Sequence, residues 1–126
     1  MPLVRVSLRT GQSDAYKRAI GDGIYTALRE TFNVPDEDRF IVISEHNAAE
    51  LQFSKTYMDI ARSDDLVVIQ ITVSNTRDVV QKQALYARIV EKLAADPGVR
   101  GEDVFINLLE VVKENWSFGN GVAQYV

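Results

Sequence analysis

The chain has 126 residues, of which 46% are hydrophobic and 25% charged, with no cysteine and a formal net charge of −4. This length and ordinary globular composition predict one domain over residues 1–126 with a single core. Without cysteine there is neither a disulfide framework nor a thiolate metal site, and the lone His46 cannot form a histidine cluster. Metal-dependent chemistry and cysteine chemistry are therefore not expected. The acidic balance provides no basic footprint for a phosphate backbone, so no nucleic-acid partner is expected.

No charged-then-apolar leader occurs in the sequence, and no apolar run approaches 18 residues. Nothing of this kind directs the chain into or across a membrane. A cytoplasmic protein without membrane contact is therefore the expectation.

Residues 1–8 predict a strand, because Val4, Val6 and Leu8 alternate with polar residues. A strand tolerates Pro2 at its first residue. If the initiator methionine is removed, Pro2 also becomes a secondary amine fixed at a strand end. An unperturbed α-amino group titrates at roughly 7.7–8.0, and burial or a nearby cation lowers that value toward the range that suits acid–base catalysis. Two interpretations stay open: Pro2 only begins a strand, or it is a catalytic amine.

Residues 14–32 predict a helix, since one apolar stripe runs along the segment. The stripe recurs at every fourth position: Ile20, Ile24, Leu28 and Phe32. Asn33 and Pro35 end this helix, and residues 39–44 predict a second strand. Strand, helix and strand with short joins form a βαβ unit with parallel strands. Residues 45–65 have no clear period and are expected to be irregular, apart from a short element near 51–53.

The pattern then begins again, with a strand at 66–73, a helix at about 77–95 and a strand at 103–109. The two halves align at a constant offset of 65 residues without a gap. The aligned pairs include Val4 with Ile69, Ile20 with Leu85, Ile24 with Ile89, Leu28 with Leu93 and Asp38 with Asp103. We interpret this as an internal β-α-β repeat, with units at about 2–44 and 66–110.

Two such units side by side predict an α/β (α+β) fold: a four-stranded mixed sheet with both helices on one face. The opposite face mixes polar and apolar residues: Leu3, Arg5, Ser7, Phe40, Val68, Gln70, Thr72 and Leu109. Such a face suits neither a core nor a solvated surface, which suggests that other subunits bury it. An oligomer is expected.

The C-terminal tail, residues 111–126, is rich in aromatic residues and glycine. Trp116 and Phe118 precede the Gly119-Asn120-Gly121 segment, and this order predicts a turn into a short strand. The tail either plugs the core or a subunit contact, or lines a small substrate pocket.

Four short segments, in this order and spacing, carry a resemblance to a known family: Met1-Pro2, Pro35-Asp36-Glu37-Asp38-Arg39, Arg62-Ser63-Asp64-Asp65 and Trp116-Ser117-Phe118-Gly119. With the tandem repeat, they make nearly the whole chain similar to the tautomerase superfamily, and within it to the malonate semialdehyde decarboxylase group. The resemblance implies a β-α-β repeat fold, a homotrimer, no metal or cofactor, and an amino-terminal proline as the catalytic group.

By position, the resemblance makes Pro2 the catalytic proline and Asp38 the acidic residue that orients it or a water. In the decarboxylases two arginines, one residue apart, hold the substrate carboxylate. Arg77 matches the second arginine, whereas Asn75 stands where the first should be. Asp38 is alternatively only a turn residue, and Arg77 only a charge in the first turn of a helix.

The same resemblance makes Trp116 and Phe118 the aromatic wall of the substrate site, and Tyr125 stands where the group has another aromatic residue. Glu45 and His46 follow the second strand and are interpreted as surface residues. Tyr57 and Arg62 lie in the irregular connection and receive no role.

These residues predict a cofactor-independent keto–enol tautomerase that acts on a small 2-oxo or 3-oxo carboxylic acid. One alternative is a decarboxylase or hydratase of the malonate semialdehyde type. The other is a trimeric binding protein that keeps the fold without the chemistry. Because a second cation at position 75 is missing, tautomerisation is favoured over decarboxylation.

Overall fold

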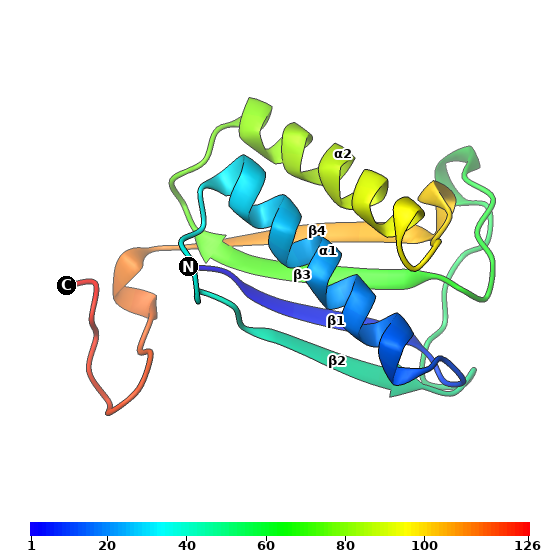
Figure 1. The fold of residues 1–126 in the computed structure, drawn as a ribbon, viewed down its shortest axis with the longest axis horizontal. Coiled ribbons are helices and arrows are strands. Elements are labelled where there is room, and N and C mark those ends of the chain that lie inside the picture. Colours follow the sequence, from blue (N-terminus) through cyan, green and yellow to red (C-terminus); the bar gives the residue numbers. More distant parts are fainter.

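The computed structural model describes all residues, 1–126. Its strands and helices are β1 (Leu3–Arg9), α1 (Asp14–Phe32), β2 (Ile41–His46), β3 (Val67–Ser74), α2 (Val79–Ala95) and β4 (Val104–Val111). The sheet order is β2-β1-β3-β4, in which β1 and β3 are antiparallel while β1 pairs with β2, and β3 with β4, in parallel. Both helices cover one face of this sheet (Figure 1). The predicted fold class, a four-stranded mixed sheet with two helices on one face, is confirmed.

Local sequence explains where α1 begins and ends. The side chain of Ser13 accepts a hydrogen bond from the backbone N–H of Tyr16 at 3.1 Å, which satisfies one of the free donors at the helix start. Asn33 ends the helix in the left-handed conformation, with φ of 54°, as C-terminal caps commonly do. The predicted bounds, 14–32, are confirmed.

Helix α2 begins at Val79, two residues later than predicted, because Asp78 caps it. The side chain of Asp78 accepts from the N–H of Gln81 at 2.8 Å, and the side chain of Gln81 accepts from the N–H of Asp78 at 3.3 Å. This reciprocal pair is a capping box. Arg77 therefore precedes the helix, and the interpretation that placed it in the first helical turn is wrong.

The core lies between the helices and the covered face of the sheet. Its centre is formed by 17 buried apolar residues, among them Val4, Val6, Ile69 and Ile71 of the two central strands. Gly23 of α1 allows the helices to approach closely, since a Cβ atom there would lie 2.9 Å from Cδ2 of Leu93. The inward alternation predicted for β1 and β3 is confirmed.

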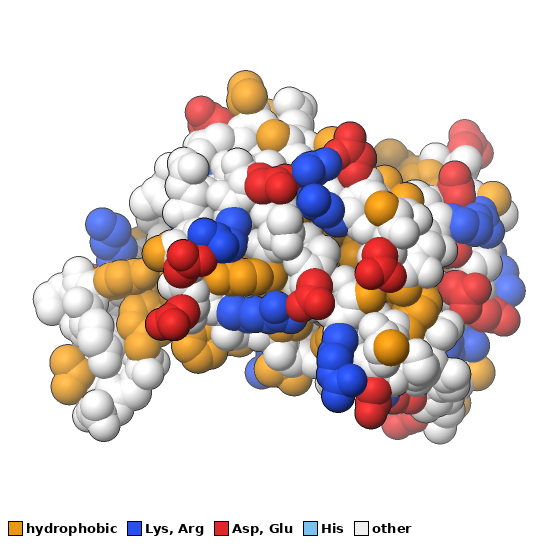
Figure 2. Space-filling view, in the orientation of Figure 1, with side chains coloured by type: hydrophobic (Ala, Val, Ile, Leu, Met, Phe, Trp, Pro, Cys, Tyr) orange, Lys and Arg blue, Asp and Glu red, His pale blue; other side chains and the backbone are white.

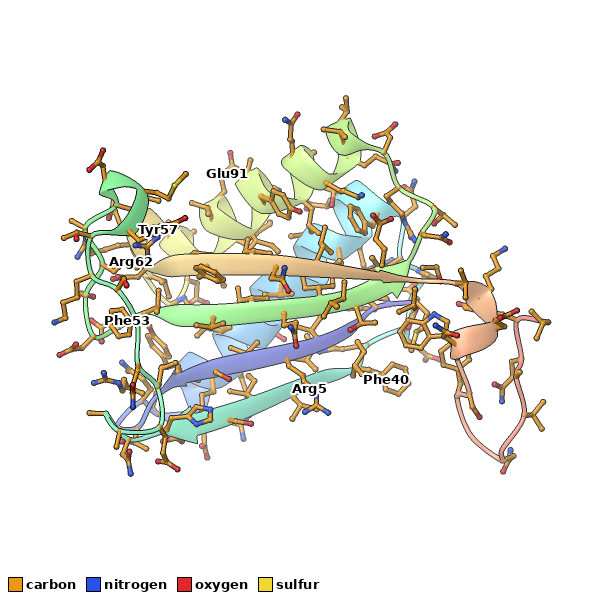
Figure 3. The ribbon with its side chains drawn as sticks, turned by 180° about the vertical axis from the view of Figure 1, so that it is seen from behind. Arg5, Phe40, Phe53, Tyr57, Arg62 and Glu91 are labelled. Atoms are coloured by element: carbon orange, nitrogen blue, oxygen red, sulfur yellow. The ribbon has the colours of Figure 1, made fainter.

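The other face of the sheet, here called the open face, carries no helix (Figure 3). Large apolar side chains are exposed on or beside it: Phe40 (51%), Val42 (44%), Phe105 (47%) and Leu109 (42%). By contrast, Figure 2 shows Lys and Arg side chains interspersed with Asp and Glu over the helical side. The helical side therefore carries mixed charges, whereas the open face exposes large apolar side chains among polar ones, as predicted.

Two local predictions are wrong. The connection before β3 holds its short 3₁₀ helix at Tyr57–Asp59 rather than at 51–53. The tail forms no strand: after a 3₁₀ turn at Lys113–Asn115, the segment 119–121 has three consecutive residues with positive φ. The side chain of Gln124 holds this curl by accepting from the N–H of Phe118 and donating to the carbonyl of Gly119, at 2.9 and 3.0 Å.

Neither helix has the length and apolar character that crossing a membrane requires.

Candidate active site

The topology brings three separate segments to one end of the sheet. Because β1 and β2 are parallel, Pro2 and Asp38 both precede a strand at this end. Because β3 runs antiparallel to β1, its last residues and Arg77 return to the same end. Figure 1 shows the N-terminus, the arrowhead of β3 and the tail together there.

The amino end of the chain is buried at this place. Pro2 is buried, and the amino nitrogen of Met1 lies 4.0 Å from Oδ2 of Asp38, with only 8% and 15% of the two side chains exposed. Burial lowers the pKa of the Met1 amino group; the negative charge of Asp38 raises this pKa, and the positive charge of Arg77 lowers it. An amine here is therefore influenced by both predicted site residues.

Asp38 is held by its backbone and keeps a free carboxylate oxygen. Its N–H donates to the carbonyl of Pro35 at 3.4 Å, and the carbonyl of the nearby Phe40 accepts from Val4 of β1 at 2.9 Å. Oδ1 of Asp38 is buried and has no hydrogen-bond partner. A buried acceptor without a partner costs about 1–3 kcal/mol, so this oxygen is ready to accept a donor such as a charged amine.

Arg77 is positioned by the end of α1. One guanidinium nitrogen donates to the carbonyl of Phe32 at 2.7 Å, another donates to Oγ1 of Thr76 at 3.0 Å, and the group lies 5.0 Å from the Phe32 ring centre. The partial negative charge at the helix C-terminus favours a cation there. A guanidinium has five N–H donors, so the remaining ones can bind a carboxylate.

Asn75 lies between β3 and Arg77. Its backbone N–H donates to the carbonyl of Val111 at 3.0 Å, which joins the ends of β3 and β4, and its side chain is exposed. The side chain brings hydrogen-bonding groups but no charge to this end of the sheet.

The three aromatic residues of the tail form one cluster. Trp116 stacks on Phe118 at a ring-centre distance of 5.5 Å, and Phe118 and Tyr125 form a T-shaped pair at a ring-centre distance of 4.9 Å. Nε1 of Trp116 is buried without a hydrogen-bond partner. No hydrogen bond or ion pair joins this cluster to Asp38 or Arg77. Within one chain, the aromatic cluster is therefore separate from the Asp38 and Arg77 group, although both lie at the Pro2 end of the sheet.

The remaining residues considered from the sequence lie elsewhere. Glu45 pairs with Lys17, and the hydrogen bond from Lys17 lowers the pKa of Glu45. His46 ends β2 opposite Arg9 of β1, away from the Pro2 end. Tyr57 and Arg62 lie at the end of the sheet opposite the tail (Figure 3).

Arg62 has a structural contact set. It donates to the backbone carbonyls of Ser54, Tyr57 and Ile60, and so fastens the connection before β3. Asp103, the repeat partner of Asp38, is 1% exposed and accepts from the N–H and hydroxyl of Ser63 at 2.7 and 2.6 Å. The same residue type thus anchors a loop in one repeat and keeps a free oxygen in the other.

One buried polar residue at the Pro2 end has no counterpart in the sequence predictions. Ser74, the last residue of β3, is 4% exposed and its hydroxyl has no hydrogen-bond partner. The one sequence signal for Ser74 is its position directly before Asn75.

The sheet built from two β-α-β repeats thus carries at one end a buried amino group beside Asp38, within the electrostatic influence of Arg77. Two family models described as "Tautomerase enzyme" match the chain, one over residues 38–119 and one over residues 2–58. The chain belongs to the tautomerase family and is an enzyme of the tautomerase superfamily.

Two curated relatives come from Bacillus subtilis (strain 168). Probable tautomerase YusQ is 38% identical over 126 residues, which is 100% of this chain and 99% of the relative. Probable tautomerase YrdN is 30% identical over 126 residues, with 100% and 97% of the two chains covered.

Solved structures agree with this fold. A malonate semialdehyde decarboxylase studied in wild-type, mutant and inactivated forms has a TM-score of 0.91 at 30% identity, covering 98% of this chain and 95% of that one. The FG41 malonate semialdehyde decarboxylase inhibited by 3-bromopropiolate also has a TM-score of 0.91, at 36% identity with 98% and 93% covered. A fused 4-OT symmetric trimer, 21% identical with 98% and 97% covered and a TM-score of 0.80, shares the fold.

Proposed function

We propose that removal of Met1 exposes Pro2 as the catalytic amine of a cofactor-independent keto–enol tautomerase for small 2-oxo or 3-oxo carboxylic acids. The observation that carries this proposal is the buried amine at the chain start, 4.0 Å from Asp38 and with its pKa lowered by burial. An amine whose pKa approaches neutral pH is partly uncharged there and acts as a general base.

In this mechanism the neutral amine of Pro2 moves one proton. In the keto-to-enol direction, Pro2 takes the proton from the carbon next to the carbonyl and then gives the same proton to the carbonyl oxygen, so that the enol forms and the amine becomes neutral again. The reverse reaction moves the proton from oxygen to carbon. Asp38 accepts a hydrogen bond from the protonated amine, and Arg77 fixes the substrate carboxylate through paired N–H donors.

The tail completes the site in this proposal. Trp116, Phe118 and Tyr125 offer an aromatic wall, which suits the carbon skeleton of a small oxo acid. Asn75 borders the carboxylate side with a neutral polar group.

A decarboxylase or hydratase is the second candidate. Its support is the similarity to two malonate semialdehyde decarboxylases at 30% and 36% identity over nearly the whole chain, the first of which is described with decarboxylase and hydratase activities. In that version protonated Pro2 polarises the carbonyl group and Asp38 assists. A non-catalytic trimeric binding protein would bind the acids without turnover.

We also propose a homotrimer in which the open face is buried between subunits. The exposed Phe40 and Phe105 on this side, at 51% and 47%, support burial by another copy, and the fused 4-OT proteins of the same fold are described as trimers. That the chain is one tautomerase-like domain and works in the cytoplasm remains a prediction, which limited proteolysis and cell fractionation would test.

The experiment for the proposed activity has two parts. Intact mass spectrometry of the purified protein should show the chain without Met1, so that Pro2 has a free amine. The loss of enol absorbance should then be followed with phenylenolpyruvate, beside carbon dioxide release from malonate semialdehyde. Rapid enol loss with slow carbon dioxide release supports the tautomerase, whereas binding of the acids without either reaction supports the binding protein.

A further inference from the structure

Ser74 has a buried hydroxyl that nothing in the chain satisfies. Five buried side-chain polar atoms lack a hydrogen-bond partner: Arg9 Nε, Asp38 Oδ1, His46 Nε2, Ser74 Oγ and Trp116 Nε1. Three of the five belong to Asp38, Ser74 and Trp116, which lie at or next to the Pro2 end of the sheet. Because each unpartnered group costs about 1–3 kcal/mol, their gathering at one end indicates that a ligand supplies the missing partners there.

The strand register locates this hydroxyl. Strands β1 and β3 are antiparallel with Leu3 opposite Thr72. Continuing this register by two residues sets Met1 opposite Ser74, and directly opposed side chains lie about 4.5–5.5 Å apart at Cβ. The extended register would bring Ser74 beside Met1, whose amino nitrogen lies 4.0 Å from Oδ2 of Asp38. When Met1 is removed, the hydroxyl borders the space that the methionine leaves, next to the Pro2 nitrogen.

The chemistry of that space suits a polar oxygen of the substrate. Asp38 accepts hydrogen bonds and Arg77 binds carboxylate, so neither is matched to a lone carbonyl oxygen. A hydroxyl donates one hydrogen bond and accepts others, and β3 fixes its position, since Ser74 pairs with Val111 of β4. The Ser74 hydroxyl is therefore already in place to donate a hydrogen bond when negative charge develops on a neighbouring substrate oxygen.

We propose that Ser74 is a substrate-binding residue of this site, whose hydroxyl donates to the carbonyl or enol oxygen of the oxo acid. This inference rests on the proposed function, and it adds the group that holds the oxygen gaining negative charge as Pro2 withdraws the proton. With Asn75 beside it, the site uses neutral donors where a second cation is absent.

The test compares Ser74→Ala with Ser7→Ala in the full-length, methionine-processed protein. Ser7 lies on the same open face, opposite Val68 and far from the Pro2 end. Ser74→Ala should lower kcat/KM for phenylenolpyruvate by at least about tenfold, since removing a single donor to a developing oxyanion costs on the order of 10²–10³ in rate. Its melting temperature should hold or rise, because an unsatisfied hydroxyl is removed. Ser7→Ala should keep the activity.

A second readout separates this inference from the proposed function. The rise in melting temperature caused by phenylpyruvate is measured for wild type and Ser74→Ala. An inactive wild type that phenylpyruvate stabilises only when Ser74 is present would defeat the tautomerase and keep the inference. An active wild type with unchanged kcat/KM in Ser74→Ala would support the tautomerase and overturn the inference about Ser74.

Two further outcomes overturn the inference. A lower melting temperature in Ser74→Ala, without a matching loss in Ser7→Ala, would assign the hydroxyl to a structural bond in the assembly. A wild type with neither turnover nor stabilisation by phenylpyruvate would reject both proposals.

Discussion

The amino nitrogen of Met1 lies 4.0 Å from Oδ2 of Asp38, in a place where burial lowers the amine pKa. The two residues are 37 positions apart in the chain (38 − 1), and the parallel pairing of β1 and β2 brings them together. With Met1 in place, the nitrogen of Pro2 is an amide and has no basicity. Processing of a single residue therefore decides whether this end of the sheet holds a base.

Replacing Pro2 with alanine tests the base directly. Alanine also permits removal of Met1, but it leaves a primary amine that is not fixed by a ring. We expect the fold to survive while enol turnover falls by at least about tenfold, within the range of a lost general base. The measurement is enol loss by absorbance, with circular dichroism as the folding control. Unchanged turnover would remove Pro2 from the mechanism.

The pH dependence tests the roles of Asp38 and Arg77. Burial lowers the pKa of the Met1 amino group, Asp38 raises it and Arg77 lowers it, and we expect the same charges to act on the Pro2 amine one residue away. If the neutral amine is the base, turnover falls as the pH drops through its pKa. Asp38→Asn should therefore move this acid limb of kcat/KM to lower pH, and Arg77→Gln should move it to higher pH.

The profile is measured with phenylenolpyruvate on processed protein, together with wild type. Opposite shifts in the two variants are the required signature. Shifts in one direction for both variants would show that general destabilisation, not charge at the amine, changes the rate.

Asn75 and Arg77 decide between tautomerisation and decarboxylation. One guanidinium orients a carboxylate well enough for proton transfer, whereas decarboxylation requires the carboxylate to be held out of the carbonyl plane. We expect Asn75→Arg to raise carbon dioxide release from malonate semialdehyde, and Arg77→Ala to lower both activities. Asn75→Gln is the matched control, because it adds length without charge. Efficient decarboxylation by wild type, with no gain from Asn75→Arg, would favour the lyase.

The oligomeric state follows from the open face. A homotrimer predicts a sedimenting mass of three times the 14.2 kDa chain at micromolar concentration. Phe105→Asp places a charge on an apolar side chain that is 47% exposed in the single chain, so burying it between subunits becomes unfavourable. This variant should shift the protein toward monomer. A wild-type monomer would contradict the trimer.

The two glycines of α1 offer a paired test of helix packing. A Cβ at Gly23 would meet Cδ2 of Leu93 at 2.9 Å and Cβ of Lys92 at 3.3 Å, whereas one at Gly21 would meet the far end of Arg39 at 3.1 Å and Cδ1 of Ile41 at an ordinary contact distance of 3.9 Å. Gly23→Ala should therefore destabilise the fold by about 1–3 kcal/mol through overpacking. Gly21→Ala should be neutral or stabilising by up to about 1 kcal/mol, because alanine favours helix. The free energy of unfolding of both variants is measured by urea denaturation. Equal changes in this free energy would contradict the predicted difference in helix packing.

Several features of this protein followed from the sequence alone. The bounds of α1 were predictable because a periodic stripe, a serine cap and Asn33 are all local signals. The polar and apolar alternation of β1 fixed which residues face the helices, since strand side chains alternate with a period of two. The order of short motifs along the chain also indicated the tautomerase superfamily, which the comparisons confirm. Its site residues remain predictions.

The tertiary structure decided what the local patterns leave open. The antiparallel pairing of β1 with β3, with Leu3 opposite Thr72, is a contact between distant segments, and it brings the end of β3 to the start of β1. The missing partner of the Ser74 hydroxyl is a property of the surrounding packing, which no periodicity reports. The tail departed from its predicted strand because three residues with positive φ and the side chain of Gln124 curl it. Asp38 and Asp103, aligned in sequence, have different contacts: Asp103 accepts hydrogen bonds from Ser63, whereas Oδ1 of Asp38 has no partner.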